Sequence, residues 1–456
     1  MSMEGVNRAR RVTARAVATG CALSLLLVTS PARAQDPVAE VAAAYENAPT
    51  TMVSLAEALN RAAGVDPDYV AALRRVGDSE WVRRSAWSAF LLPVIDFRWS
   101  WSKYSSPQFN IGTGEETDQL TQFGLTGVYT LFNGGSRIFD MKAANADVDG
   151  AEAGERRQRF QTALGTEADY YNALAQKELL RVADERKSRA VEQLAVARAR
   201  VLSGAAVQTD SLQLVLELTR AQVDLLRQES ALSVSQMQLG RRVGIPGRVA
   251  AEPLDTLPAP ALPFTEAQAI DEAVTVSPIV LFARAEERRT DAVFKSERGA
   301  YLPTISLFGN WAGFDDAIIP DATKRATLGV TLNFPIWDGA LREIRVYRAS
   351  TARQIAETAR RNTELGVGRD MAEAYQAYNV ARASAGLAAN AVLVARENLR
   401  VQDERYRAGA TTILDLLTAQ VALTEAEAGL VQSRFTTRLA RAGVEAILGR
   451  RLTATR

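Results

Sequence analysis

The chain has 456 residues, with 54 Lys and Arg against 53 Asp and Glu, one Cys and no His. The lack of His excludes a Ser-His-Asp triad and histidine metal ligands. The composition leaves room for a carboxylate enzyme, but no paired acidic motif indicates one. We therefore predict a protein that is not an enzyme and needs no cofactor or metal.

Residues 1–34 have the pattern of a cleavable secretory signal, in which four Arg precede an apolar stretch at 16–28 and an Ala-Arg-Ala site at 32–34. The stretch is shorter than the about 20 residues of a membrane-spanning helix, and the alternative is a short amphipathic anchor. Cys21 suggests a lipoprotein site, but the apolar run follows this Cys instead of preceding it. Cleavage would remove five Arg and one Glu, so the formal charge would change from +1 to about −3. No basic excess would then remain to bind nucleic acid.

The mature chain is predicted to open with an extended segment at 35–53. A helical pattern follows from Ser54 to about Leu91, with apolar residues at three- and four-residue spacing. Ser54 and Glu57 match a capping box at the start of this helix, and Pro93 ends it.

The hydrophobic period then changes to two, which predicts strands. Two strands are expected in each half of the chain, at about 94–104, 120–131, 304–314 and 326–336. Segments of about ten residues cross a membrane when tilted. Four of the six Trp lie in or beside these strands, as an interfacial girdle requires: Trp99, Trp101, Trp311 and Trp337. The alternative is a soluble antiparallel sheet with one wet face.

A very long, charged helix follows each strand pair, at about 136–202 and 341–408. Each would reach about 100 Å, and its charges exclude it from lipid. Each helix ends at a tip, and the chain then returns as a shorter helix. The tips are predicted at 203–209 and 409–414, and the returning helices at 210–243 and 415–448.

The two halves match at a constant offset of 205 residues. The matching pairs are Gly134 and Gly339, Tyr170 and Tyr375, Gly204 and Gly409, and Asp210 and Asp415. We predict a first structural repeat at 54–245 and a second at 264–450. A Pro-rich linker at 246–263 separates them, and a short tail at 451–456 follows the second.

A sheet in lipid must close on itself, because lipid does not satisfy unpaired backbone groups. Single-chain barrels begin at about eight strands, and this chain supplies four. Several copies must therefore share one barrel if the strands cross a membrane. Two copies would give eight strands and three would give twelve, and the periodicity leaves both open.

These features resemble the TolC-like outer-membrane efflux protein family over about residues 54–449. The resemblance rests on a turn at 131–135 (Leu-Phe-Asn-Gly-Gly), its partner at 337–339 (Trp-Asp-Gly), and tip segments that begin at Arg200 and Arg405. It implies a membrane α/β-barrel fold of two tandem helix–β-hairpin–helix repeats. It also implies a homotrimer that shares a 12-stranded barrel in the outer membrane of a Gram-negative-type cell, continued by an α-helical barrel in the periplasm. Its implied partners are a periplasmic adaptor and an inner-membrane pump that supplies the energy.

The resemblance also implies a gate at the closed periplasmic end of the tunnel. The implied gate residues are Thr209, Asp210, Tyr406, Thr411 and Asp415. Thr411 departs from the family pattern, because better-studied channels have an Arg there, and Thr418 stands where a second carboxylate often occurs. A structural alternative makes Thr209, Asp210 and Asp415 the N-caps of the returning helices and makes the tip glycines left-handed helix ends.

Small residues at the two tips would permit close approach of an adaptor hairpin. The expected docking residues are Gly204, Ala205, Gly409 and Ala410. The expected function is the outer-membrane channel of a tripartite efflux pump, which conducts substrates passively through an iris-like gate. The alternatives are the outer-membrane duct of type I protein secretion and, from another class, a periplasmic coiled-coil scaffold.

Overall fold

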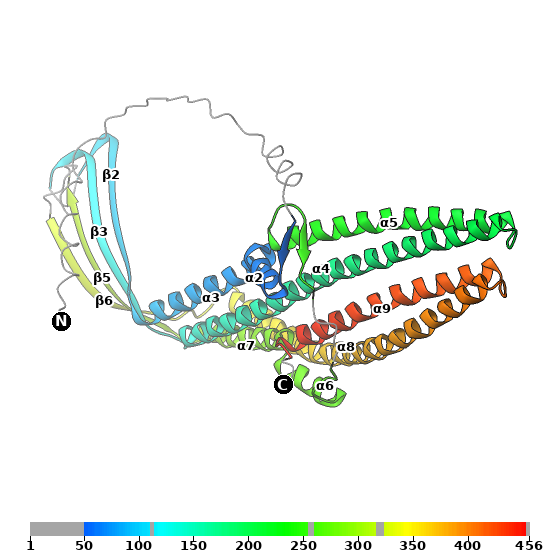
Figure 1. Cartoon of the computed structure of the whole chain (residues 1–456). Helices are drawn as coiled ribbons and strands as arrows, with labels where there is room; N and C mark the ends of the chain where they lie inside the picture. The colour runs from blue at the N-terminus through cyan, green and yellow to red at the C-terminus, as the bar shows by residue number, and fades with distance from the viewer. Residues whose placement is uncertain (1–49, 110–113, 254–259, 316–322, 453–456) are drawn as a thin grey trace, which may run out of the picture. The chain divides into compact units, whose positions relative to one another are not determined.

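The structure is a computed structural model that describes residues 50–109, 114–253, 260–315 and 323–452. The predicted signal, most of segment 35–53, the middle of the linker and most of the tail lie outside the described residues. All described residues fall in one unit, Asn47–Arg456. Figure 1 shows the elements, which are, in chain order, β1 (Thr51–Val53), α2 (Leu55–Val65), α3 (Pro67–Leu91), β2 (Val94–Phe109), β3 (Glu116–Asn133), α4 (Ser136–Leu202), α5 (Gln208–Val243), β4 (Val249–Ala251), α6 (Glu266–Val276), α7 (Pro278–Arg298), the 3-10 helix η1 (Gly299–Tyr301), β5 (Thr304–Asp315), β6 (Thr323–Asn333), α8 (Leu341–Arg407) and α9 (Ile413–Leu448).

The internal duplication is visible in the helix lengths. Helices α4 and α8 have 67 residues each, and α5 and α9 have 36 each. Helix α4 has the predicted bounds, and α8 ends one residue before its predicted end. Both α5 and α9 begin two residues earlier than predicted. Their ends in the two repeats are 205 residues apart, which is the offset of the sequence pairs.

A left-handed turn leads from each hairpin into its long helix. Gly134 and Gly339 have φ values of 67° and 72° there. A Cβ on Gly134 would lie 2.1 Å from the carbonyl oxygen of Gly299, so this position accepts only Gly. The turn of the first repeat therefore packs directly against the end of α7.

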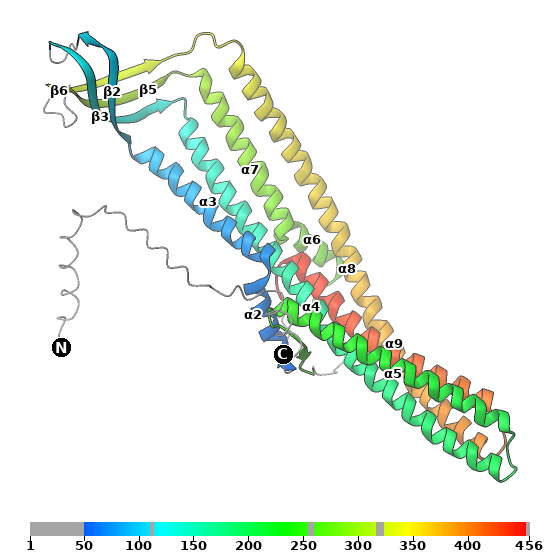
Figure 2. The same ribbon diagram turned by 90° about the horizontal axis from the view of Figure 1, so that it is seen from above.

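The helices pack side by side, and α4 and α8 run through the whole packed layer. In the half beside the sheet, the contacts give the order α3, α4, α7, α8, and in the half that ends at the tips they give α5, α4, α9, α8. Figure 2 shows α5 continuing the line of α3, and α9 that of α7. Each long helix is thus matched by two shorter helices placed end to end.

The single helix predicted at 54–91 is wrong, because the structure has two helices there. Asp66 ends α2 and also caps α3, where its side chain accepts bonds from the backbone N–H groups of Asp68 and Tyr69 at 3.0 Å. Pro67 occupies the first helical position of α3 and disfavours a helical conformation at Asp66. The break is therefore local in origin.

The sequence pattern did not predict the small parallel sheet of β1 and β4, which joins the start of the described chain to the linker. Thr51 pairs with Val249 and Val53 with Ala251. The buried Tyr170 hydroxyl donates to the carbonyl oxygens of Val53, at 3.3 Å, and Glu252, at 2.9 Å. Both strands of this sheet are therefore held to α4 at their C-terminal ends.

The four predicted strands form one antiparallel sheet in the order β2, β3, β5, β6. Strands β2 and β3 extend beyond their predicted segments, because backbone pairing resumes after a bulge, with Gln108 opposite Thr117 and Phe109 opposite Glu116, where mainly polar residues give no alternation. Strand β6 ends at Asn333 and not at residue 336, because Pro335 lacks the N–H that pairing requires. Phe97, Leu125, Trp311 and Ala326 stand opposite one another across the sheet.

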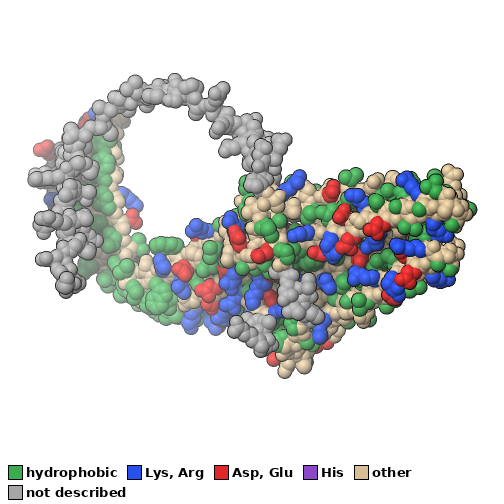
Figure 3. Space-filling model, viewed as in Figure 1, with side chains coloured by type: hydrophobic (Ala, Val, Ile, Leu, Met, Phe, Trp, Pro, Cys, Tyr) green, Lys and Arg blue, Asp and Glu red, His purple; other side chains and the backbone are tan. Residues whose placement is uncertain are grey.

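In the described ranges, no helix combines the length and the apolar character needed to cross a membrane. In the face shown in Figure 3, Lys, Arg, Asp and Glu side chains are distributed along the helices, while hydrophobic side chains gather on the visible part of the sheet. On this face the charged side chains therefore lie mainly on the helices.

Candidate functional site

The candidate site lies at the two tips, where α4 turns into α5 and α8 turns into α9. Gly204 and Gly409 both have φ +76°, which allows the same helix end in each repeat. The N–H groups of Gly204 and Ala205 donate to the carbonyls of Val201, at 3.1 Å, and Arg200, at 2.8 Å. This pair of bonds is a Schellman motif, so the first tip glycine is a left-handed helix end, as the structural alternative expected.

The second tip repeats this geometry. The N–H groups of Gly409 and Ala410 donate to the carbonyls of Tyr406, at 3.0 Å, and Arg405, at 2.8 Å. Arg405 also donates to the carbonyl of Ala410 at 3.4 Å. Both tips are therefore closed by backbone bonds and carry exposed small side chains at their ends.

Arg200 links the two tips within one chain. Its guanidinium donates to the carbonyl of Tyr406 in the second repeat and to that of Ala205 in its own repeat, at 3.1 Å. It also lies 4.7 Å from the centre of the Tyr406 ring, a cation–π contact. The resemblance did not assign Arg200 a role, although its matched position with Arg405 is visible in the sequence.

Helix α9 begins with a capping box. The N-cap is Thr412, whose hydroxyl accepts from the Asp415 N–H at 3.3 Å, and the Asp415 carboxylate accepts from the Thr412 N–H at 3.2 Å. Asp415 also accepts from the hydroxyls of Thr412, at 2.7 Å, and Thr411, at 2.8 Å. The Thr412 and Thr411 bonds hold the pKa of the Asp415 carboxyl below its usual range. Asp415 is thus the third helical residue and not the N-cap that the structural alternative proposed.

Helix α5 begins differently. Its N-cap is Val207, which has no side-chain bond to the helix, so Thr209 and Asp210 are the second and third helical residues. The N-cap alternative is therefore wrong for these two residues as well. The Asp210 carboxylate lies in the first turn, where it is favoured by the helix dipole.

Tyr406 is buried at the second tip and faces the first. Burial, followed by the charge of Asp210, raises the pKa of the Tyr406 phenol. Within the described part of the chain, the Tyr406 hydroxyl has no hydrogen-bond partner. Of the five predicted gate residues, the structure thus groups Tyr406 with Asp210 and groups Thr411 with Asp415. Thr209 is exposed beside Asp210.

The four Trp predicted to form a girdle are all exposed. Trp99 and Trp101 lie on β2, and Trp311 lies on β5, where its ring meets Phe123 edge to face at 5.3 Å between ring centres. Trp337 follows the end of β6, in the connection to α8. The four rings therefore occupy different heights along the sheet.

Comparison with known proteins places this architecture in a family. The family model "Outer membrane efflux protein" matches residues 82–244 and 269–450, which is more than half of the chain. Protein CyaE of Bordetella pertussis is 25% identical over 324 residues, which cover 69% of this chain and 68% of CyaE.

Two solved structures share the fold. CusC superposes with a TM-score of 0.75 at 16% identity, over 89% of this chain and 95% of CusC. The CmeC outer membrane channel of Campylobacter jejuni superposes with a TM-score of 0.74 at 16% identity, over 87% of this chain and 85% of CmeC. With the matched repeats and the long helices, these findings show that the chain belongs to the outer membrane efflux protein family.

Proposed function

We propose that three copies of this chain form one outer-membrane channel, which passively conducts substrates delivered by an inner-membrane transporter through a periplasmic adaptor. The observation that carries this proposal is the open four-stranded sheet. Its edge strands, β2 and β6, each have one partner among the described strands. Lipid requires every backbone group to be paired, so these edges need neighbouring copies.

The side chains of the sheet fit a lipid environment. Leu328, Val330 and Leu332 alternate along β6 with exposed fractions of 64–77%. On β2, an exposed apolar run begins near Val94 and ends at Trp101. With about 3.4 Å per residue and a tilt near 40°, this run covers roughly 18 Å of depth. The proposal places Trp99 and Trp101 at the outer boundary of the membrane and Trp337 at the periplasmic boundary.

The outermost helices offer a matching edge for the next copy. Val380, Leu387 and Val394 of α8 are 63%, 70% and 70% exposed and are seven residues apart, which is the spacing of a coiled-coil seam. On the other side of the layer, α3 contains no buried residue. Packing α8 of one copy against α3 and α5 of the next would bury both edges and close a twelve-stranded barrel with its helical tunnel.

In this assembly the tips form the gate. Asp210 and Asp415 from three copies would place six carboxylates around the periplasmic end, where they attract cations and repel one another. The unpartnered Tyr406 hydroxyl beside Asp210 would contribute to the closed state. Thr411 bonds Asp415 in its own chain, so we propose that it stabilises the tip turn and does not lock neighbouring copies together.

The assembly is tested by measuring the mass of the detergent-solubilised protein together with its conductance in a planar bilayer. We expect a trimer and stepwise currents that cations block from the periplasmic side. Asp210→Asn and Asp415→Asn should each weaken the block. Asp370→Asn is the control, because this carboxylate lies on α8 about 55 Å from the tip. A monomer that is extracted without detergent and carries no current would refute the proposal and favour the scaffold.

Adaptor docking is tested separately at the tips. We expect Ala410→Trp to abolish crosslinking to the adaptor and leave the trimer intact, because the bulky ring would occupy the small-residue end. Gly409→Ala is the control for backbone strain at a φ of +76° without added bulk. Normal crosslinking of Ala410→Trp would exclude the tip as the docking surface.

A further inference from the structure

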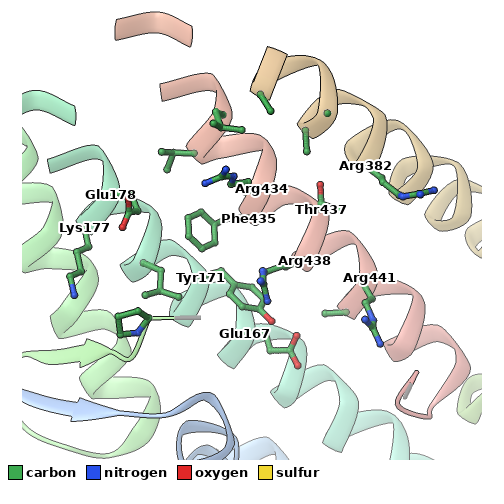
Figure 4. Close-up of a pocket in the computed structure, with 18 of the residues that line it drawn as sticks. Glu167, Tyr171, Lys177, Glu178, Arg382, Arg434, Phe435, Thr437, Arg438 and Arg441 are labelled. Carbon is green, nitrogen blue, oxygen red and sulfur yellow. The ribbon is translucent and has the colours of Figure 1, made fainter. Parts of the chain in front are cut away.

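A cavity of about 750 Å³ lies between α4, α8 and α9, away from the tips and from the sheet. Its walls come from both repeats, because α4 belongs to the first and α8 and α9 belong to the second. Figure 4 shows Tyr171 of α4 facing Phe435 and Arg438 of α9 across this space. The volume is in the range of small-molecule sites.

The cavity lining carries an excess of positive charge. It includes eight Lys and Arg side chains but only four carboxylates. All four carboxylates have cationic partners within the lining. These pairs are Glu167 with Arg451, Glu445 with Arg441 and Arg451, Glu427 with Arg396, and Glu178 with Arg181.

Two of the remaining cations are available to a ligand. Lys177 of α4 and Arg434 of α9 line the cavity, and neither has an ion-pair partner in the described ranges. Arg438 of α9 lies at the phenol of Tyr171. An anion in the cavity would therefore meet positive charge from two helices.

The other walls are apolar and aromatic. The rings of Tyr171 and Phe435 lie 6.3 Å apart between centres, with 32° between their planes. Leu174, Leu430 and Val431 continue this surface. Burial raises the pKa of Tyr171 to about 12, so the phenol stays neutral in the physiological range and adds no negative charge to the wall.

We propose that this cavity binds an amphipathic organic anion. Its flat apolar body would lie against Tyr171 and Phe435, and its carboxylate or sulfonate would lie toward Arg434 and Lys177. Such a ligand would connect α4 of the first repeat to α8 and α9 of the second. This site is separate from the proposed gate, and its occupancy does not depend on conduction.

The test is isothermal titration of the purified full chain, in a nonionic detergent, with naphthalene-2-sulfonate. Naphthalene-2-sulfonamide is the matched neutral probe, because it keeps the ring and nearly the same shape but lacks the charge. Titration of detergent alone corrects for binding to micelles. We expect saturable binding of the sulfonate and at least tenfold weaker binding of the sulfonamide. Equal binding of the two probes, or none of the sulfonate, would overturn the proposal.

Variants locate the site. Arg434→Gln should weaken sulfonate binding about tenfold, the usual effect of losing a hydrogen bond to a charged group. Arg434→Lys should restore most of this binding, and Lys177→Gln should weaken it by a smaller factor. Arg227→Gln, an exposed Arg of α5 outside the cavity, is the control. Equal loss in Arg227→Gln and Arg434→Gln would show that the anion binds the surface generally and would refute a site in the cavity.

Discussion

Replacing Arg451 with Met should destabilise the folded protein far more than the same change at the adjacent Arg450. The Arg451 guanidinium pairs with Glu167 of α4 and, at 2.9 Å, with Glu445 of α9. The side chains of these two carboxylates are only 5% and 7% exposed. Arg451, the first residue after the second repeat, therefore links α9 to α4 of the first repeat through two buried carboxylates.

The loss of stability in Arg451→Met comes from Glu167, the carboxylate that loses its partner. Glu445 keeps Arg441 at 3.2 Å. Among the described residues Glu167 has no second ion pair, so without Arg451 it would be left buried and charged. Removing one partner of a buried pair costs about 3–5 kcal/mol, and we take the lower end because Arg451 itself is partly exposed. The pair of Arg450 with Glu272 is more exposed on both sides, so Arg450→Met should cost less than about 1 kcal/mol.

The deficit of Arg451→Met should also depend on pH. Burial raises the pKa of Glu167 above its ordinary value, and Arg451 opposes that rise. Because the folded pKa is raised, the stability that this carboxyl contributes is fully present below its unfolded pKa of about 4.3 and is lost as pH rises through the folded pKa. Without Arg451 the folded pKa rises further. The unfolding temperature of the variant should therefore differ least from that of the unchanged protein near pH 5 and most near pH 8.

Thermal unfolding of the detergent-solubilised protein, followed by circular dichroism at 222 nm at a fixed scan rate, measures the effect. Arg451→Lys should recover part of the loss, since it keeps the charge. Equal unfolding temperatures for the Arg450 and Arg451 variants would refute the reasoning. So would a deficit of Arg451→Met that stays constant from pH 5 to pH 8.

Two further changes probe the packing of the repeats by the same unfolding measurement. Gly134→Ala should cost about 3 kcal/mol, because it combines a left-handed residue with overlap on the Gly299 carbonyl. Gly154→Ala, in open space inside α4, should be neutral or slightly stabilising, and equal losses would contradict this. Tyr170→Phe should cost about 1 kcal/mol, because the Glu252 carbonyl loses the hydroxyl that donates to it at 2.9 Å, while the Val53 carbonyl keeps the Glu252 N–H. The exposed Tyr347→Phe should have no effect, and stability of Tyr170→Phe equal to that of the unchanged protein would count against the role of this bond.

Local patterns in the sequence were enough to identify the long helices, the strands and the tips. The period of two marks the strands, the Gly pairs mark the turns, and the duplication indicates that both halves share one plan. The break between α2 and α3 was not predicted, although the sequence contains a signal for it, because Asp66-Pro67 is a typical start of a helix. At the tips, the Gly-Ala ends were recognised, but the capping pattern at Thr412 was missed.

The contacts that position the candidate sites come from residues far apart in the chain. Thr51 pairs with Val249 in the small sheet, Arg200 bonds Tyr406 across the tips, and Arg451 reaches Glu167. Periodicity reports which face of an element is apolar but not which element covers it. The sequence by itself therefore determined the elements and their duplication. Only the tertiary structure decided which charges meet, because those partners are set by helix packing and not by neighbouring residues.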